Sequence, residues 1–143
     1  MVGYGVNYET GTAIHGGTLR AGMENPLHVW VPSIGASGLM LYNGDRFPQW
    51  RGSLFAGGLS GEQIARLTMD GQKVVLEETL LHRMGRVRDV RQGPDGYIYV
   101  ASDGNKRDDK TPIYRLEPAD ESQTSDSTGR QKELGLESAL APR

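Results

Sequence analysis

Short segments in which every second residue is apolar, separated by glycine- and proline-rich turns, fill the middle of the chain. Residues two apart share one face of a strand, so this period predicts β-strands rather than helices. The predicted strands cover residues 27–31, 37–42, 53–59, 63–69, 73–81, 85–92, 97–101 and 112–117. Twenty glycines and seven prolines agree with a chain of strands and tight turns. The expected fold class is therefore all-β.

Two features of these segments place them in a sheet. Residues 53–59 are apolar along both faces, which is typical of a central strand. Asp70-Gly71 is a hairpin turn signal that joins residues 63–69 to residues 73–81 as antiparallel neighbours. A helix at residues 73–81 is the alternative, but its apolar residues fit a helical face only loosely, and its β-branched start favours a strand.

The two ends of the chain lack this pattern. Residues 1–26 are rich in glycine without a sustained period, which predicts a loop. A long loop of this kind is typical of a functional segment or of a piece of something larger. Residues 119–143 hold mostly polar and charged side chains and no aromatic residue, which predicts a disordered polar tail. The expected organisation is one domain over residues 1–118 and a tail over residues 119–143.

Composition and charge exclude several classes of function. The net charge of −2 is nearly balanced, whereas a nucleic-acid binder normally carries a basic stripe. No segment approaches the roughly 20 apolar residues of a membrane span. The first residues have neither the basic region nor the apolar core of a secretory signal. The chain has no cysteine, so disulfides and thiolate metal sites are excluded.

Two stretches of the chain resemble each other. Residues 53–59, a loop and Ile64-Ala65-Arg66-Leu67 form the first, and residues 97–103, a loop and Ile113-Tyr114-Arg115-Leu116 form the second. The offset falls in the range of propeller blades, which are sheets of four antiparallel strands. The chain holds material for about two blades and an N-terminal loop, whereas a ring needs about four to eight. We therefore expect a piece of a larger protein, or a protomer that completes a ring with its own copies.

Arg86 and Arg88 precede a sharp turn at Gly93-Pro94-Asp95-Gly96. In a regular strand they point the same way, with Val87 and Asp89 on the other side. Two neighbouring guanidinium groups repel each other unless an anion lies between them, and a carboxylate or a phosphate suits each fork best. The pair therefore indicates an anion site, with a solvated strand face as the alternative.

The loop over residues 103–110 contains three aspartates. The ordered spacing and the closing glutamate of a calcium-binding loop are missing, so the loop is predicted to be a solvated tip without a metal.

Several motifs, in this order and spacing, resemble the soluble, pyrroloquinoline-quinone (PQQ)-dependent aldose sugar dehydrogenases, which form the glucose/sorbosone dehydrogenase family. The motifs are Tyr4-Gly5-Val6-Asn7-Tyr8, Gly22-Met23-Glu24-Asn25-Pro26-Leu27, Trp30-Val31-Pro32-Ser33-Ile34, Ser37-Gly38, Tyr42-Asn43-Gly44-Asp45-Arg46-Phe47-Pro48 and the stretch from Arg86 to Gly96. The resemblance covers residues 2–118. It implies a six-bladed β-propeller of which this chain supplies the C-terminal portion, about two blades.

The resemblance also implies a chemistry. Members oxidise the anomeric carbon of an aldose to a lactone, with a histidine as base and with hydride passing to PQQ, which sits on a calcium ion. PQQ carries three carboxylates, and the resemblance makes Arg86, Arg88 and Ser33 its binding residues here. Family members are commonly exported to the periplasm or secreted.

The chain also departs from the family pattern. Ser60 stands where many members have a cofactor-contacting lysine, and Gly35-Ala36 replaces a common Ala-Pro. The catalytic histidine and the calcium ligands lie in earlier blades, so we assign no catalytic residue and no metal ligand to this chain. His15, His28 and His82 match none of the family's catalytic motifs.

Two functions are compatible with these observations. The chain is either the cofactor-binding portion of a sugar dehydrogenase, inactive without the missing blades, or a non-catalytic association module from a truncated gene. A lectin-like sugar binder is a third possibility that rests on Trp30, Trp50 and exposed tyrosines, but blade packing explains these aromatic residues more simply.

Overall fold

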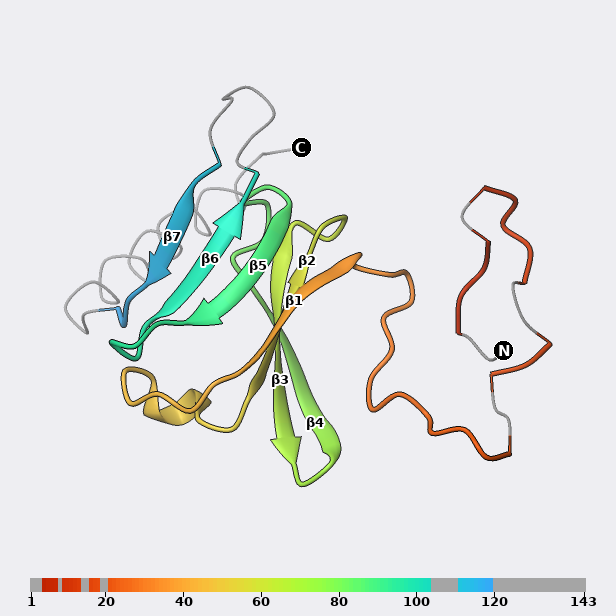
Figure 1. Ribbon diagram of the computed structural model, residues 1–143, viewed down its shortest axis with the longest axis horizontal. Helices are drawn as coiled ribbons and strands as arrows, with labels where there is room; N and C mark the ends of the chain where they lie inside the picture. Colours follow the sequence, from red (N-terminus) through yellow and green to blue (C-terminus); the bar gives the residue numbers. More distant parts are fainter. Residues whose placement is uncertain (1–3, 8, 14–15, 19–20, 104–110, 120–143) are drawn as a thin grey trace, which may run out of the picture.

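The computed structural model describes residues 4–7, 9–13, 16–18, 21–103 and 111–119, which form two antiparallel sheets (Figure 1). The first sheet has the strand order β1 (Ala36–Leu41), β2 (Leu54–Gly58), β3 (Gln63–Asp70) and β4 (Lys73–Leu80). The second has the order β5 (Val87–Gln92), β6 (Ile98–Ser102) and β7 (Ile113–Leu116). A short 3-10 helix, η1 (Pro48–Trp50), lies between β1 and β2. The all-β prediction is confirmed, because each sheet is an up-and-down meander of the kind that forms a propeller blade.

The predicted repeat corresponds to real strands. Residues of β2 and β3 form the first copy, and residues of β6 and β7 form the second. In both copies the Arg-Leu pair lies in the third strand of its sheet, at Arg66-Leu67 in β3 and at Arg115-Leu116 in β7. Asp70-Gly71 forms the hairpin turn between β3 and β4, where Gly71 has a φ of 58°, a conformation that glycine adopts without strain.

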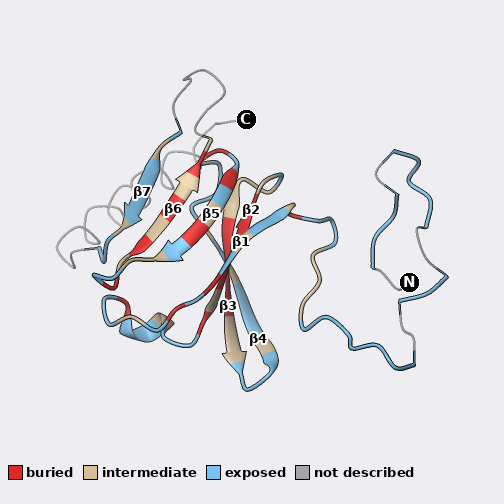
Figure 2. Ribbon diagram, in the orientation of Figure 1, coloured by how far each residue is buried: buried red, intermediate tan, exposed pale blue. Residues whose placement is uncertain are grey.

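The hydrophobic core lies between the two sheets (Figure 2). Every residue of β2 except Leu54 is buried, as predicted for a central strand. The first sheet contributes Met40, Phe55 and Ile64, and the second contributes Val87, Val90, Ile98 and Val100. Burying a side chain of this size contributes about 1.5–3 kcal/mol, so this layer fixes how the two sheets sit against each other.

The prediction of a strand at residues 27–31 is wrong. Trp30 packs against the cluster of Ile34, Ala56 and Ala65, on the side of the first sheet away from the second. Its indole N–H donates a hydrogen bond to Oε1 of Glu77 on β4 over 2.8 Å. The segment thus holds to the sheet through side chains rather than through a backbone ladder, and Pro32 has no N–H to offer. We call residues 28–34 the strap.

The structure describes most of the N-terminal segment and almost none of the predicted C-terminal tail. Within residues 4–35, the described part contains turns and one isolated bridge, between Val6 and Ala13, in keeping with the predicted loop. The predicted tail over residues 119–143 lies outside the described residues except for residue 119. In the described ranges, no helix is long and apolar enough to cross a membrane.

Candidate functional site

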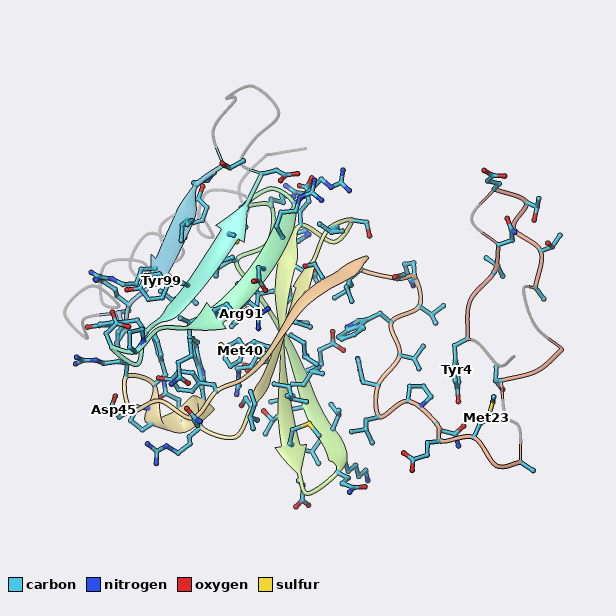
Figure 3. All side chains as sticks on the ribbon, in the orientation of Figure 1. Tyr4, Met23, Met40, Asp45, Arg91 and Tyr99 are labelled. Atoms are coloured by element: carbon cyan, nitrogen blue, oxygen red, sulfur yellow. The ribbon has the colours of Figure 1, made fainter. Side chains whose placement is uncertain are left out.

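The first strands of the two sheets, β1 and β5, run side by side. Near their starts, the Ser37 hydroxyl donates a hydrogen bond to the carbonyl oxygen of Val87 over 2.7 Å. Beyond their ends, Oε1 of Gln92 accepts hydrogen bonds from the backbone N–H groups of Asn43 and Gly44, at 2.9 and 3.0 Å. Figure 3 shows Met40 of β1 and Arg91 of β5 in this same region. In a propeller the first strand of each blade lines the central channel, so β1 and β5 are the strands on which a channel site would lie.

Arg88 sits at a β-bulge. Val87 pairs with Ser102 and Asp89 pairs with Ala101, so two steps along β5 correspond to one step along β6. Val87 and Val90 are consequently both fully buried although they lie three residues apart, and Arg88 is exposed. The predicted unbroken alternation is therefore wrong at this point. A bulge re-aims a side chain, and such irregularities are common beside functional sites.

The re-aimed Arg88 holds a carboxylate of its own chain. Its Nε and Nη2 atoms donate hydrogen bonds to Oδ1 and Oδ2 of Asp103, each over 2.7 Å. The backbone N–H of Asp103 donates to the carbonyl oxygen of Arg86 over 3.0 Å. The hydrogen bonds from Arg88 hold the pKa of the Asp103 carboxyl below its ordinary value, and the same pairing raises the pKa of Arg88. Asp103 is thus attached to both members of the predicted arginine pair.

Arg86 differs from Arg88 in having no such partner. Its side chain is exposed and makes no hydrogen bond or ion pair with the described residues. Its positive charge still reaches Asp103, whose pKa it lowers slightly further. The pair therefore consists of one guanidinium group held by a carboxylate and one that is available to an anion.

Ser33 lies on the strap, three residues before β1. Its hydroxyl oxygen accepts a hydrogen bond from the N–H of Gly35 over 3.1 Å, and its carbonyl oxygen accepts one from the Ser60 hydroxyl, also over 3.1 Å. The structure thus brings Ser33 next to Ser60, the residue at the position where many family members have a lysine. Ser33 and the two arginines lie at the same end of β1 and β5, the end marked by the Ser37–Val87 hydrogen bond.

The histidines lie apart from this group. Nε2 of His28 is 2.9 Å from Oε2 of Glu77 on β4, the strand of the first sheet most distant from β1, and its ring packs edge-on against Trp30. His82 is exposed just after β4, and His15 lies outside the described residues. No cluster of three or more histidine, aspartate or glutamate side chains that could hold a metal ion occurs in the described part of the chain.

Sequence reasoning missed Asp103 as a site residue and placed it in a solvated tip. A signal existed, since the turn at residues 93–96 fixes the register between β5 and β6. Gln92 of β5 pairs with Ile98 of β6. Because the strands are antiparallel, each earlier residue of β5 lies opposite a later residue of β6, which places the end of β6 beside Arg88. The rest of the tip, residues 104–110, lies outside the described residues.

Two adjoining antiparallel sheets, with their first strands side by side and an arginine pair at the end of one, define part of a β-propeller with a candidate anion site. The family model for glucose/sorbosone dehydrogenases matches residues 1–115. The chain belongs to the glucose/sorbosone dehydrogenase family, as the sequence motifs indicated.

Known proteins agree with this assignment. The chain is 43% identical over 88 residues to the aldose sugar dehydrogenase YliI of Escherichia coli K12, which covers 61% of this chain and 24% of that protein. A crystal structure of a glucose dehydrogenase matches with a TM-score of 0.74 and 43% identity, over 82% of this chain and 34% of that one. The PQQ-bound aldose sugar dehydrogenase of Streptomyces coelicolor shares the fold, with a TM-score of 0.53 and 23% identity, over 68% of this chain and 29% of that one. The chain thus spans about a quarter of the length of the curated relatives it matches.

Proposed function

We propose that this chain is the cofactor-binding portion of a PQQ-dependent aldose sugar dehydrogenase, with Arg86, Arg88 and Ser33 as cofactor-binding residues. The observation that carries the proposal is the exposed guanidinium group of Arg86, which has no partner in the described residues and stands next to Arg88 at the start of β5. Blades outside this chain would supply the catalytic base and the calcium ligands.

The donor set suits an anionic, oxygen-rich ligand such as PQQ. Arg86 can give a carboxylate two parallel hydrogen bonds, and Arg88 keeps three of its five N–H groups after binding Asp103. Ser60, at the usual lysine position, is uncharged, and its hydroxyl hydrogen is already donated to the carbonyl oxygen of Ser33. The arginine pair therefore supplies most of the attraction for an anion in this portion of the protein.

The chain's own residues would bind and orient rather than react. PQQ, when bound, supplies the acceptor for the hydride that leaves the anomeric carbon of the sugar. Arg86 would hold a carboxylate of the cofactor at the start of β5, and Arg88 would hold a second anionic oxygen close by. His28 takes no part, because its ring is packed on Trp30 and its Nε2 faces Glu77.

The proposal is tested by titrating the purified chain with PQQ and following binding by calorimetry. Arg86→Ala should weaken binding by about tenfold or more, since it removes a bidentate, charge-assisted contact. Arg91→Ala is the matched control, because Arg91 is an exposed arginine of β5 that is already paired with Asp89 at 2.9 Å. Equal loss of affinity in both variants would contradict the assignment of Arg86.

An association module is the second candidate function, and β1 favours it. Leu39 and Leu41 are 59% and 58% exposed, on the side of the first sheet away from the core. The side of the second sheet away from the core carries the exposed Ile113 but also the exposed charged residues Arg91 and Arg115. A ring made of copies would set the leucines against these charges, so a different sheet with an apolar face is the better partner.

Native mass spectrometry distinguishes a ring made of copies of this chain from a chain that needs a different partner sheet. The chain alone should be monomeric or form mixed aggregates rather than a closed trimer. A discrete trimer would show that copies of the chain complete the ring.

A further inference from the structure

The contacts of Asp103 constrain it more than an ordinary surface aspartate. Its carboxylate is bonded through both oxygens to Arg88, and its backbone N–H is bonded to the carbonyl oxygen of Arg86. It follows directly after β6, where Ser102 is buried and donates its hydroxyl hydrogen to the carbonyl oxygen of Met84 over 2.9 Å. The Asp103 carboxylate therefore binds Arg88 from a backbone position that these hydrogen bonds fix.

This arrangement leaves a defined part of Arg88 for a ligand. Asp103 occupies Nε and one N–H of Nη2, which form one edge of the planar guanidinium group. The remaining N–H of Nη2 and one N–H of Nη1 form the outer edge, which fits a second carboxylate in the same bidentate geometry. A side chain as long as arginine otherwise loses considerable rotational freedom when it binds, and Asp103 has already restricted that freedom.

We propose that Asp103 is a positioning residue that fixes the Arg88 guanidinium group with its outer edge towards an anionic ligand, so that Arg86 and Arg88 form an asymmetric clamp. Arg86 supplies the mobile member and Arg88 the fixed one. This inference rests on the proposed function, because the ligand is the carboxylate-bearing cofactor assigned above.

The opposite role for Asp103 is also physically possible. A carboxylate beside two arginines could compete with an external anion and lower its affinity, and removing the negative charge would then strengthen binding. The bulge argues for positioning, because it aims Arg88 at Asp103 at the cost of a regular ladder.

The test compares Asp103→Asn with Asp89→Asn in calorimetric titrations of the full chain with PQQ. Both substitutions remove one negative charge from an aspartate paired with an arginine of β5, so the change in overall charge is the same. Asp103→Asn should bind PQQ about tenfold more weakly than Asp89→Asn. Equal or tighter binding by Asp103→Asn would overturn the proposal.

A second measurement examines the arginine itself. The Nε–H signal of Arg88 in nitrogen-15 NMR should report a rigid side chain in the wild type and a mobile one in Asp103→Asn, while the Arg91 signal stays unchanged. An Arg88 signal equally mobile in both proteins would overturn the proposal. If the wild type fails to bind PQQ, the proposed function fails, and the NMR comparison still decides whether Asp103 fixes Arg88.

Discussion

The hydroxyl group of Tyr42 donates a hydrogen bond to the carbonyl oxygen of Gly96 over 2.8 Å, and it accepts one from the N–H of Phe47 over 3.1 Å. Tyr42 is fully buried and follows β1, whereas Gly96 lies in the turn between β5 and β6. One phenol group therefore joins the two sheets and also holds the loop that leads into η1.

Tyr42→Phe tests the importance of this junction. The substitution leaves a buried carbonyl oxygen and a buried N–H without their partner, so we expect a loss of about 1–3 kcal/mol in the free energy of unfolding. Urea denaturation measures this loss. Tyr114→Phe is the control, because Tyr114 is 42% exposed on β7, and it should change stability very little. An equal effect of both substitutions would contradict the role of the buried hydroxyl.

Gly38→Ala tests how closely β1 and β5 approach. A methyl group at Gly38 would overlap with the Asp89 carboxylate and would lie 2.7 Å from the backbone nitrogen of Val90. Because the backbone cannot move away freely, we expect a destabilisation of about 1–3 kcal/mol in thermal or urea unfolding. Gly5→Ala has open space around it and serves as the control. A Gly38→Ala protein as stable as the control would show that the two strands can separate without cost.

Glu77→Ala tests what holds the strap. Glu77 accepts the indole N–H of Trp30 and faces Nε2 of His28, so its carboxylate connects the strap to β4. Hydrogen exchange at residues 28–31 should become faster in the variant, because Glu77 makes the polar contacts that hold this part of the strap to β4. Ser33 and Ile34 should be affected less, since their carbonyl oxygens accept hydrogen bonds from residues 60 and 61. Glu24→Ala, at an exposed position outside the strap, should leave this exchange unchanged. Unchanged exchange in Glu77→Ala would mean that apolar packing of Trp30 is sufficient.

The pair of Tyr99 and Asp95 predicts a pH effect on the alkaline side. The Tyr99 hydroxyl donates a hydrogen bond to Oδ2 of Asp95 over 2.7 Å, which raises the pKa of Tyr99 above its ordinary value of 10.0. Since the folded-state pKa is the higher one, the stabilisation is fully present below pH 10.0 and is lost as the pH rises through the folded-state pKa.

Phenolate absorbance during an alkaline titration checks this prediction, with Tyr99→Phe used to identify the Tyr99 contribution. Asp95→Asn should lower the midpoint of that contribution, because an amide attracts the phenol hydrogen less than a carboxylate does. A midpoint unaffected by Asp95→Asn would show that burial, not the hydrogen bond, sets the pKa.

Most of the fold could be predicted from the sequence because alternation reports burial directly. Seven predicted strands correspond to β1–β7, with ends shifted by a few residues at most. The strand predicted at residues 27–31 failed because apolar alternation around Trp30 also fits a segment that attaches through side chains. A single sequence cannot separate these two cases, since both use apolar side chains. In the structure His28, Val29 and Trp30 are all partly buried, without alternation.

The candidate site could be predicted in part from the sequence. The type and spacing of Arg86 and Arg88 indicated an anion site, and the family resemblance suggested the ligand. The bulge at Arg88 depends on pairing between β5 and β6, so strand-by-strand analysis did not reveal it. Asp103 was missed for the same reason, because its role arises from register across a hairpin rather than from its neighbours in the sequence.

The exposed leucines of β1 have a consequence for handling the protein in the laboratory. Leu39 and Leu41 contact water as long as no other sheet covers them, so the chain produced by itself should be poorly soluble at high concentration. Co-expression with the remaining blades of a relative should raise the soluble yield, because the leucines would then enter an interior.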